Sequence, residues 1–356
     1  MAEFFTSNSF LINLIGINAV LALSIYITLS CAMLSLSNAA SMAIGAYTAS
    51  MLTVNAGWGL WPAAIAGAAV AGFVALLLGL PILRLRGVFL AIATVGFVEV
   101  VRIVIVNIQA LGGPEGFRLS AGANPVTVSG WEVYGLLLVT SFFFARMRGS
   151  RMGMALEAIR EDENAARTMG VHVTQYKVVA FVTGAVIAAL AGALYAHMRG
   201  FISPGDFGFQ RAVEILMFAV VGGTLVWRGA ILGAFVITIL PEVIRNVPVM
   251  GGVDIKNNPE LFSGLILLAV ILFLPNGLLS TALGIRLPWQ RVRPTVPEQA
   301  TADPHQSELG DANRIDSIEA EALRGTGTAA TSQAGPEADA PESGVTRTGA
   351  GPKEAS

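Results

Sequence analysis

Long, nearly uncharged apolar runs alternate with short polar breaks over about the first 280 residues of this 356-residue chain. A hydrocarbon core about 30 Å thick needs about 20 helical residues to cross it. The candidate runs fall at 10–31, 39–56, 61–82, 88–108, 131–146, 177–198, 212–226, 229–246 and 260–276. The pattern predicts an all-α, polytopic bundle of transmembrane helices with eight to ten spans, nine being favoured.

Lys and Arg in the breaks predict the direction in which the helices run. With nine spans and the N-terminus outside, the cytoplasmic segments hold twelve Lys and Arg residues and the outside segments hold five. Six of the twelve lie between residues 146 and 177. Cytoplasmic loops of membrane proteins carry the excess of positive charge. We therefore expect an N-out, C-in orientation.

Composition supports a membrane protein whose last residues form an acidic, polar segment. The chain is 54% hydrophobic and 13% charged, whereas soluble domains carry about 25% charged residues. Residues 294–356 contain no Phe, Trp or Tyr and carry a net charge of −7. Such a segment buries too little apolar surface to offset its ordering entropy. We expect a transmembrane domain over residues 1–285 and a disordered cytoplasmic tail over residues 286–356.

The sequence lacks the patterns that carry catalysis or metal binding. It has no phosphate-binding loop, no H-E-x-x-H and no paired-cysteine zinc spacing. Its one cysteine, Cys31, lies in the first apolar run, and His172, His197 and His305 are scattered. We therefore expect no enzyme, no metal and no cofactor in this chain. If the protein performs energised transport, another chain must bind the nucleotide.

The longest cytoplasmic connection, residues 147–176, has its own periodicity. Apolar residues recur at helical spacing, and charged residues from Glu157 to Arg167 occupy the other faces. The apolar positions are Met152, Leu156, Ile159, Ala166 and Met169. We predict one or two short amphipathic helices that end at Gly170. Such helices either lie on the membrane surface or fit a groove on a partner and transmit its motion.

This connection resembles a known coupling motif. Ala165-Ala166-x-x-x-Gly170 resembles the E-A-A-x-x-x-G motif of bacterial ATP-binding-cassette importer permeases. The surrounding residues 155–170 look like the version found in branched-chain amino-acid permeases. Asn164 stands where the glutamate of the motif falls, and Glu163 precedes it.

Other motifs follow in the order of the same family, over about residues 10–285. They are Arg84-Leu-Arg-Gly, Gly112-Gly-Pro-Glu-Gly, Phe201-Ile-Ser-Pro-Gly-Asp and Leu274-Pro-Asn-Gly-Leu. The first two resemble the M-type subunit of the pair of permeases in such importers. One departure is Ser37-Asn38, where the family commonly has Gly-His. This departure bears on substrate specificity.

The resemblance implies a function and a set of partners. It implies translocation of leucine, isoleucine and valine across the bacterial plasma (inner) membrane by alternating access, driven by ATP on partner subunits. The implied partners are a second homologous permease, two cytoplasmic ATP-binding subunits and an extracytoplasmic substrate-binding protein. Lipid surrounds the bundle, and nucleic acid is not expected.

Two groups of residues are candidates for the functional sites. For ATPase coupling they are Arg160, Glu163, Ala165, Ala166 and Gly170, although Arg160 and Glu163 could simply pair with neighbours. For the translocation pathway they are Ser35, Ser37, Asn38 and Glu214. The first three open the second run, where a helix N-terminus can face a carboxylate or where Ser and Asn serve as ordinary caps. Glu214 could attract a substrate ammonium if it reaches the pathway.

Other functions remain open at this point. A related permease could carry urea, amides or other small amino acids. An ion-coupled secondary transporter would work alone and should show clustered carboxylates at the membrane midplane. The chain could also be a membrane anchor for a regulatory partner. Glu99 and Arg102, three residues apart in the fourth run, are expected to form a structural pair.

Overall fold

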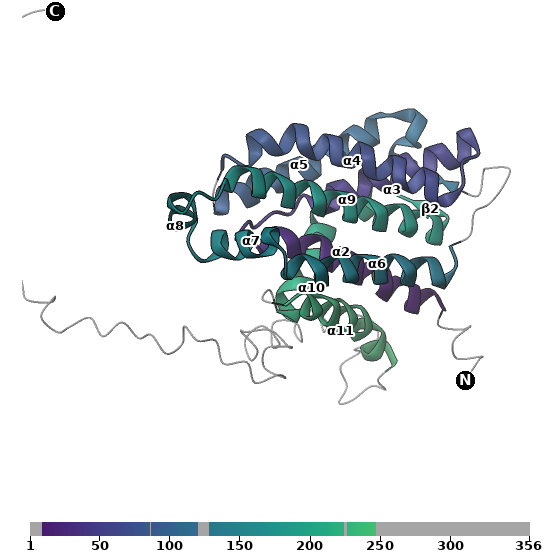
Figure 1. The fold of residues 1–356 in the computed structure, drawn as a ribbon. Coiled ribbons are helices and arrows are strands. Elements are labelled where there is room, and N and C mark those ends of the chain that lie inside the picture. The colour runs from purple at the N-terminus through teal and green to yellow at the C-terminus, as the bar shows by residue number, and fades with distance from the viewer. Residues whose placement is uncertain (1–8, 86, 120–127, 224–225, 247–356) are drawn as a thin grey trace, which may run out of the picture. The chain divides into compact units, whose positions relative to one another are not determined.

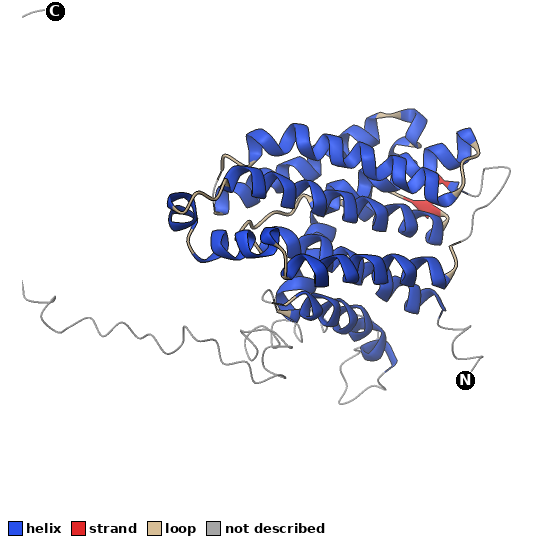
Figure 2. Cartoon of the chain, in the orientation of Figure 1, coloured by secondary structure: helices blue, strands red, loops and turns tan. Residues whose placement is uncertain are grey.

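The computed structural model of the chain describes residues 9–85, 87–119, 128–223 and 226–246, all within the compact unit Met1–Arg286. The expected ninth span at 260–276 and the predicted tail at 286–356 lie outside these residues. The described part is built mainly of helices (Figures 1 and 2). The helical prediction is therefore confirmed for this part of the chain.

Eight of the predicted runs correspond to helices whose ends lie within a few residues of the expected ones. They are α2 (Ser9–Leu29), α3 (Asn38–Ala56), α4 (Leu60–Ile82), α5 (Val88–Asn107), α6 (Gly130–Arg148), α9 (Val173–Arg199), α10 (Phe209–Gly222) and α11 (Trp227–Asn246). Two shorter helices, α7 (Arg151–Glu161) and α8 (Glu163–Thr168), lie between α6 and α9.

Four of the described helices, α2, α4, α5 and α9, are long and apolar enough to cross a membrane. The pair α10 and α11 can count as a fifth, bent by 119° at its break. Helix α3 is less apolar because it carries buried polar residues such as Asn38 and Ser50, which its neighbours shelter. The structure thus describes four or five membrane-spanning helices, and nine spans with an N-out orientation remain a prediction.

Helix α9 lies in the centre of the bundle and packs against α2, α3 and α4. Small residues let these helices approach closely. A Cβ atom at Gly192 would lie 2.1 Å from the carbonyl oxygen of Met42, and one at Gly45 would lie 2.3 Å from that of Ala189. Backbones packed this closely gain dispersion contacts that lipid cannot replace. The core around α9 is accordingly rich in fully buried alanines.

The two ends of the bundle differ in structure. Helices α7 and α8 lie at the end that we call the coupling end, where α2, α4 and α6 finish and α5 and α9 begin (Figure 1). The opposite end carries two strands, β1 (Phe117–Arg118) and β2 (Phe201–Ile202), paired antiparallel (Figure 2). The short 3-10 helices η1 (Gln109–Leu111), η2 (Gly113–Glu115) and η4 (Pro204–Phe207) are beside them. An all-α prediction missed these two-residue strands, since they are too short to show an alternating pattern.

The expected pair in α5 is present. Arg102 Nε donates to Glu99 Oε2 at 2.7 Å, and the other carboxylate oxygen of Glu99 accepts from the backbone N–H of Phe209 at 3.3 Å. The pair therefore also joins α5 to the start of α10, which supports its structural interpretation.

Candidate functional site

Helix α7 is amphipathic, as its sequence predicts. Its cap is Ser150, whose Oγ accepts from the backbone N–H of Gly153 at 3.4 Å. Leu156 and Ile159 are buried on the inner face, whereas Met154 on the outer face is 60% exposed. The helix is therefore anchored on the bundle by one face and leaves the other free for a partner.

Helix α8 is capped at both ends by hydrogen bonds. Asp162 caps it, and its Oδ1 accepts from the N–H groups of Asn164 at 2.7 Å and Ala165 at 3.0 Å. At the other end Gly170 has φ +84°, while Val171 N–H donates to the carbonyl oxygen of Ala166. With the bond from Gly170 N–H to Arg167 O, this is a Schellman motif. The prediction of short helices ending at Gly170 is confirmed.

The two alanines of the motif face opposite ways. Ala166 is buried against the bundle, whereas Ala165 is exposed next to Asn164. Met169, predicted from the spacing to lie on the apolar face, is instead 84% exposed at the end of α8. Exposed Met and Ala at a helix tip form a small apolar surface suited to a partner.

Glu163 contacts residues of its own chain. Its carboxylate accepts from Arg167 Nη2 at 2.7 Å and from Lys177 Nζ at 2.8 Å. Lys177 belongs to α9, so Glu163 joins the short helix α8 to the central helix of the bundle. Neighbour pairing is thus the observed role of Glu163, and its contact with an ATPase stays a prediction.

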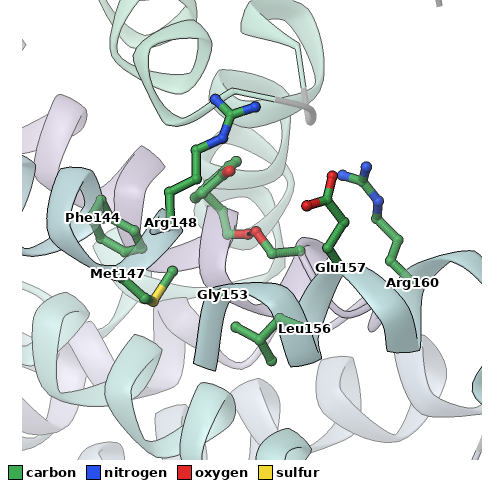
Figure 3. A pocket seen from close by; sticks show the side chains of 9 residues that line it. Phe144, Met147, Arg148, Gly153, Leu156, Glu157 and Arg160 are labelled. Carbon is green, nitrogen blue, oxygen red and sulfur yellow. Dashed lines mark hydrogen bonds between the residues drawn. The ribbon is translucent and has the colours of Figure 1, made fainter. Parts of the chain in front are cut away.

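Arg160 lies between two cavities at the coupling end. One, of about 40 Å³, lies among the ends of α2 and α6 and the start of α7 (Figure 3). There Glu157 and Arg160 project from α7 side by side, and Leu156 points away from them. This space is far smaller than a ligand pocket, which takes about 300–1,000 Å³. It suits the tip of one partner side chain.

The second cavity has about 200 Å³ and lies under α7 and α8. It is lined by Arg160, Glu163 and Lys177 on one side and by Cys31 and Met33, which follow α2, on the other. Burial raises the pKa of the Cys31 thiol to about 12. Cys31 is therefore a protonated thiol of low reactivity beneath the coupling segment, residues 147–176.

Ser35, Ser37 and Asn38 are buried where α3 begins. Ser35 Oγ and Ser37 Oγ are 2.9 Å apart, and Asn38 Nδ2 donates to Ser24 Oγ in α2 at 2.8 Å. Ser37 precedes α3 without a side-chain capping bond. In this conformation Asn38 joins α3 to α2, whereas Ser35 and Ser37 bond to each other, and a role of the three in the pathway stays a prediction.

Glu214 belongs to a polar network near the opposite end of the bundle. Its Oε2 accepts from Arg211 Nη1 at 2.6 Å, and Arg211 Nη2 donates to Asn18 Oδ1 at 2.8 Å. Asn18 Nδ2 in turn donates to Thr238 Oγ1 at 2.9 Å. The network lines a cavity of about 510 Å³ between α2, α9, α10 and α11.

Sequence reasoning found Glu214 but missed its partners. Asn18 is a polar residue in the middle of the first apolar run, and a polar residue at such a position indicates a contact inside the bundle. Arg211 is separated from Asn18 by 193 positions, so only the fold reveals their contact. Within the described residues, no group of His, Cys, Asp or Glu could hold a metal ion.

Comparisons of the sequence with known proteins point to one family. A family model described as branched-chain amino acid transport system / permease component matches residues 8–274. The chain is 34% identical over 300 residues to the high-affinity branched-chain amino acid transport system permease protein LivM of Salmonella typhimurium and of Escherichia coli K12. These alignments cover 74% of this chain and 66%, just under two thirds, of each relative.

Shorter matches link the chain to other permeases. LivH of Escherichia coli K12 is 29% identical over 169 residues, which is 48% of this chain and 51% of LivH. The autoinducer 2 import system permease protein LsrC of Photorhabdus laumondii is 30% identical over 152 residues, covering 40% of this chain and 42% of LsrC. No solved structure matches the chain. The longer and closer match to LivM confirms the resemblance to the M-type subunit.

Proposed function

Because the chain belongs to the branched-chain amino acid transport system permease family, we propose that it is the M-type permease subunit of an ATP-binding-cassette importer for leucine, isoleucine and valine. The match over residues 8–274 is the observation that carries this proposal. Family membership and several apolar helices identify a multi-pass protein of the bacterial inner membrane. The substrates are proposed from the names of the LivM relatives.

The proposed partner within the membrane is a second, LivH-like permease. The weaker match to LivH, over 48% of this chain, supports a second permease that is related in sequence to this one. Two ATP-binding subunits would complete the complex at the coupling end, and a substrate-binding protein would dock at the opposite end. The nucleotide chemistry belongs to the ATPases, and this chain supplies the pathway.

The coupling segment explains how a partner's motion would enter the bundle. The exposed tip around Ala165 and Met169 is available to an ATPase groove. The ion pair between Glu163 and Lys177 connects α8 to α9, and α9 packs against α2, α3 and α4. A displacement of α8 would therefore be passed to the centre of the bundle, which is what alternating access requires.

Reconstitution tests the proposal. The chain is inserted into liposomes with its second permease, both ATPase subunits and the binding protein, and uptake of radiolabelled leucine is measured. We expect uptake only with ATP on the ATPase side and only when every subunit is present. Uptake by this chain alone, driven by a proton or sodium gradient, would overturn the proposal in favour of a secondary transporter.

A further inference from the structure

The cavity beside Glu214 has the size and the lining of a small-ligand site. Its volume of about 510 Å³ is within the range of about 300–1,000 Å³ that ligand pockets occupy. Leu11, Leu14 and Ile237 supply apolar walls from α2 and α11. Arg211 and Glu214 supply opposite charges from α10. A concave site with some apolar walls and a few convergent polar groups is a common design of a binding site for small molecules.

Arg211 is held in a way that prepares its guanidinium for an anion. Its side chain is 11% exposed, with Asn18 and Glu214 on its two Nη atoms. The ring of Tyr195 lies 5.6 Å from the guanidinium carbon. Among the described residues, the buried Nε atom has no hydrogen-bond partner. The buried Nε is out of reach of a ligand in the cavity, but each Nη atom carries a second N–H beside the one bonded to Glu214 or Asn18. These second N–H groups can bind a carboxylate.

Glu214 supplies the opposite charge at the more open part of the cavity. Its side chain is 40% exposed, and its Oε2 is the atom bonded to Arg211. An ionised carboxylate can accept several hydrogen bonds, so this group can receive an ammonium while it remains close to Arg211. The two charges are adjacent, as are the two charges of an α-amino acid.

Arg211 and Glu214 of α10 and Ile237 of α11 lie on a pair of bent helices. Helices α10 and α11 are bent by 119° at the break after Gly222. They pack closely, since a Cβ atom at Gly233 would lie 2.0 Å from the carbonyl oxygen of Phe218. Discontinuous helices of this kind often form the substrate sites of transporters. The bent pair therefore frames one side of the cavity, and α2 and α9 frame the other.

We propose that this cavity is a binding site for the zwitterion of an aliphatic α-amino acid, with Arg211 on the α-carboxylate, Glu214 on the α-ammonium, and Leu11, Leu14 and Ile237 on the side chain. This assignment rests on the proposed function and deepens it. A zwitterion adds no net charge to the cavity. A ligand with only one charged group brings an uncompensated charge into the cavity beside the ion pair of Arg211 and Glu214, and an uncompensated charge is costly to bury. The site therefore selects amino acids over aliphatic acids and amines.

Charge variants in the complete reconstituted complex test the assignment. Arg211→Gln and Glu214→Gln should each lower the initial rate of ATP-driven leucine uptake about tenfold or more, the loss expected for one charge-assisted hydrogen bond. Arg102→Gln is the matched control, because Arg102 and Glu99 form an ion pair of the same i, i+3 spacing outside the cavity. The control should retain most of the uptake.

A charge exchange separates ligand binding from a purely structural ion pair. In the double variant Arg211→Glu with Glu214→Arg, a pair forms again but its direction is reversed. We expect assembly and basal ATPase activity to persist while leucine uptake stays low. Restored uptake in the exchanged protein would overturn the assignment, because a structural pair works in either direction.

Protection from modification measures binding directly. In a Cys31→Ser background, Thr238→Cys places a thiol at the cavity, and its reaction with a small methanethiosulfonate is followed. Leucine at millimolar concentration should slow the reaction several-fold, whereas 4-methylpentanoate and 3-methylbutylamine should not. Equal protection by all three compounds would refute the site. So would a lack of protection by leucine if the variant complex, before reaction with the reagent, still imports leucine. Absence of leucine uptake by the unmodified complex would instead refute the proposed function.

Discussion

Gly170 shows how one backbone angle determines the end of the coupling segment. Its φ of +84° lies in the left-handed region, and no atom lies within 4 Å of a Cβ built there. Backbone strain and not a steric clash is therefore what excludes other residues. The sequence predicted this role correctly, because glycine after an amphipathic run is the usual signal for such an end.

Replacing Gly170 with Val should weaken coupling without preventing membrane insertion. The left-handed conformation costs a residue with a Cβ atom about 1–2 kcal/mol, and a β-branched side chain costs more. We expect ATPase activity to lose its stimulation by the loaded binding protein. The readout is that stimulation in the reconstituted complex.

Two variants serve as controls for this change. Gly149→Val lies in the same connection at φ −88°, again with no atom within 4 Å of an added Cβ, and should be tolerated. Gly170→Asn should be milder than Gly170→Val, since Asn adopts the left-handed region more readily. Equal damage from Gly149→Val and Gly170→Val would show that backbone angle is not the cause.

The pair of Glu163 and Lys177 should carry motion from α8 to α9. Breaking it with Lys177→Gln should cost about 1–2 kcal/mol of local stability, a partly buried pair being worth more than an exposed one. We expect transport to fall while the complex still assembles. The exchange Glu163→Lys with Lys177→Glu should recover part of the transport, measured as leucine uptake per ATP hydrolysed. No recovery, with an intact complex, would argue against transmission through this pair.

At the scale of whole elements, the close contact between α3 and α9 makes the bundle one unit. Gly192→Leu should abolish this contact, because a Cβ atom at position 192 would lie 2.1 Å from the carbonyl oxygen of Met42. Overpacking usually costs about 1–3 kcal/mol, and backbone on both sides of this contact leaves little room to relax. Thermal unfolding in detergent should show a large loss of stability. Gly96→Leu in α5, with no atom within 4 Å, should leave the transition almost unchanged.

Helix positions were predictable from the sequence because long apolar runs have few alternatives to a membrane helix. The predicted runs 61–82 and 88–108 nearly coincide with α4 and α5. The bend between α10 and α11 was harder to foresee, because apolarity continues through both helices while the Gly222-Gly223 break turns the chain. Hydropathy reports transfer to lipid and carries little information about angles between helices.

At the scale of the whole molecule, the functional residues divide according to how local their contacts are. The coupling segment, residues 147–176, was predictable from neighbouring residues alone, since its caps and its apolar face are local. The cavity lined by Asn18, Arg211 and Thr238 lies between helices from distant parts of the chain, so no local sequence pattern predicts it. We therefore propose a permease with a local docking element and a substrate cavity made by the fold.

In the proposed mechanism, nucleotide on partner subunits moves the coupling end of this chain. Cys31, the one cysteine in the chain, lines the cavity beneath Arg160 and Glu163 and reports on that motion without any substitution. While it is buried, with the pKa of its thiol near 12, reaction with maleimide should be slow and should rise about tenfold per pH unit.

The decisive measurement is the rate of Cys31 modification in the reconstituted, transporting complex, with and without ATP and orthovanadate. The account predicts that at least one nucleotide state exposes the thiol and speeds its modification about tenfold or more, as burial gives way to an ordinary thiol pKa of about 8.5. A slow rate identical in every nucleotide state, while leucine uptake proceeds, would contradict it.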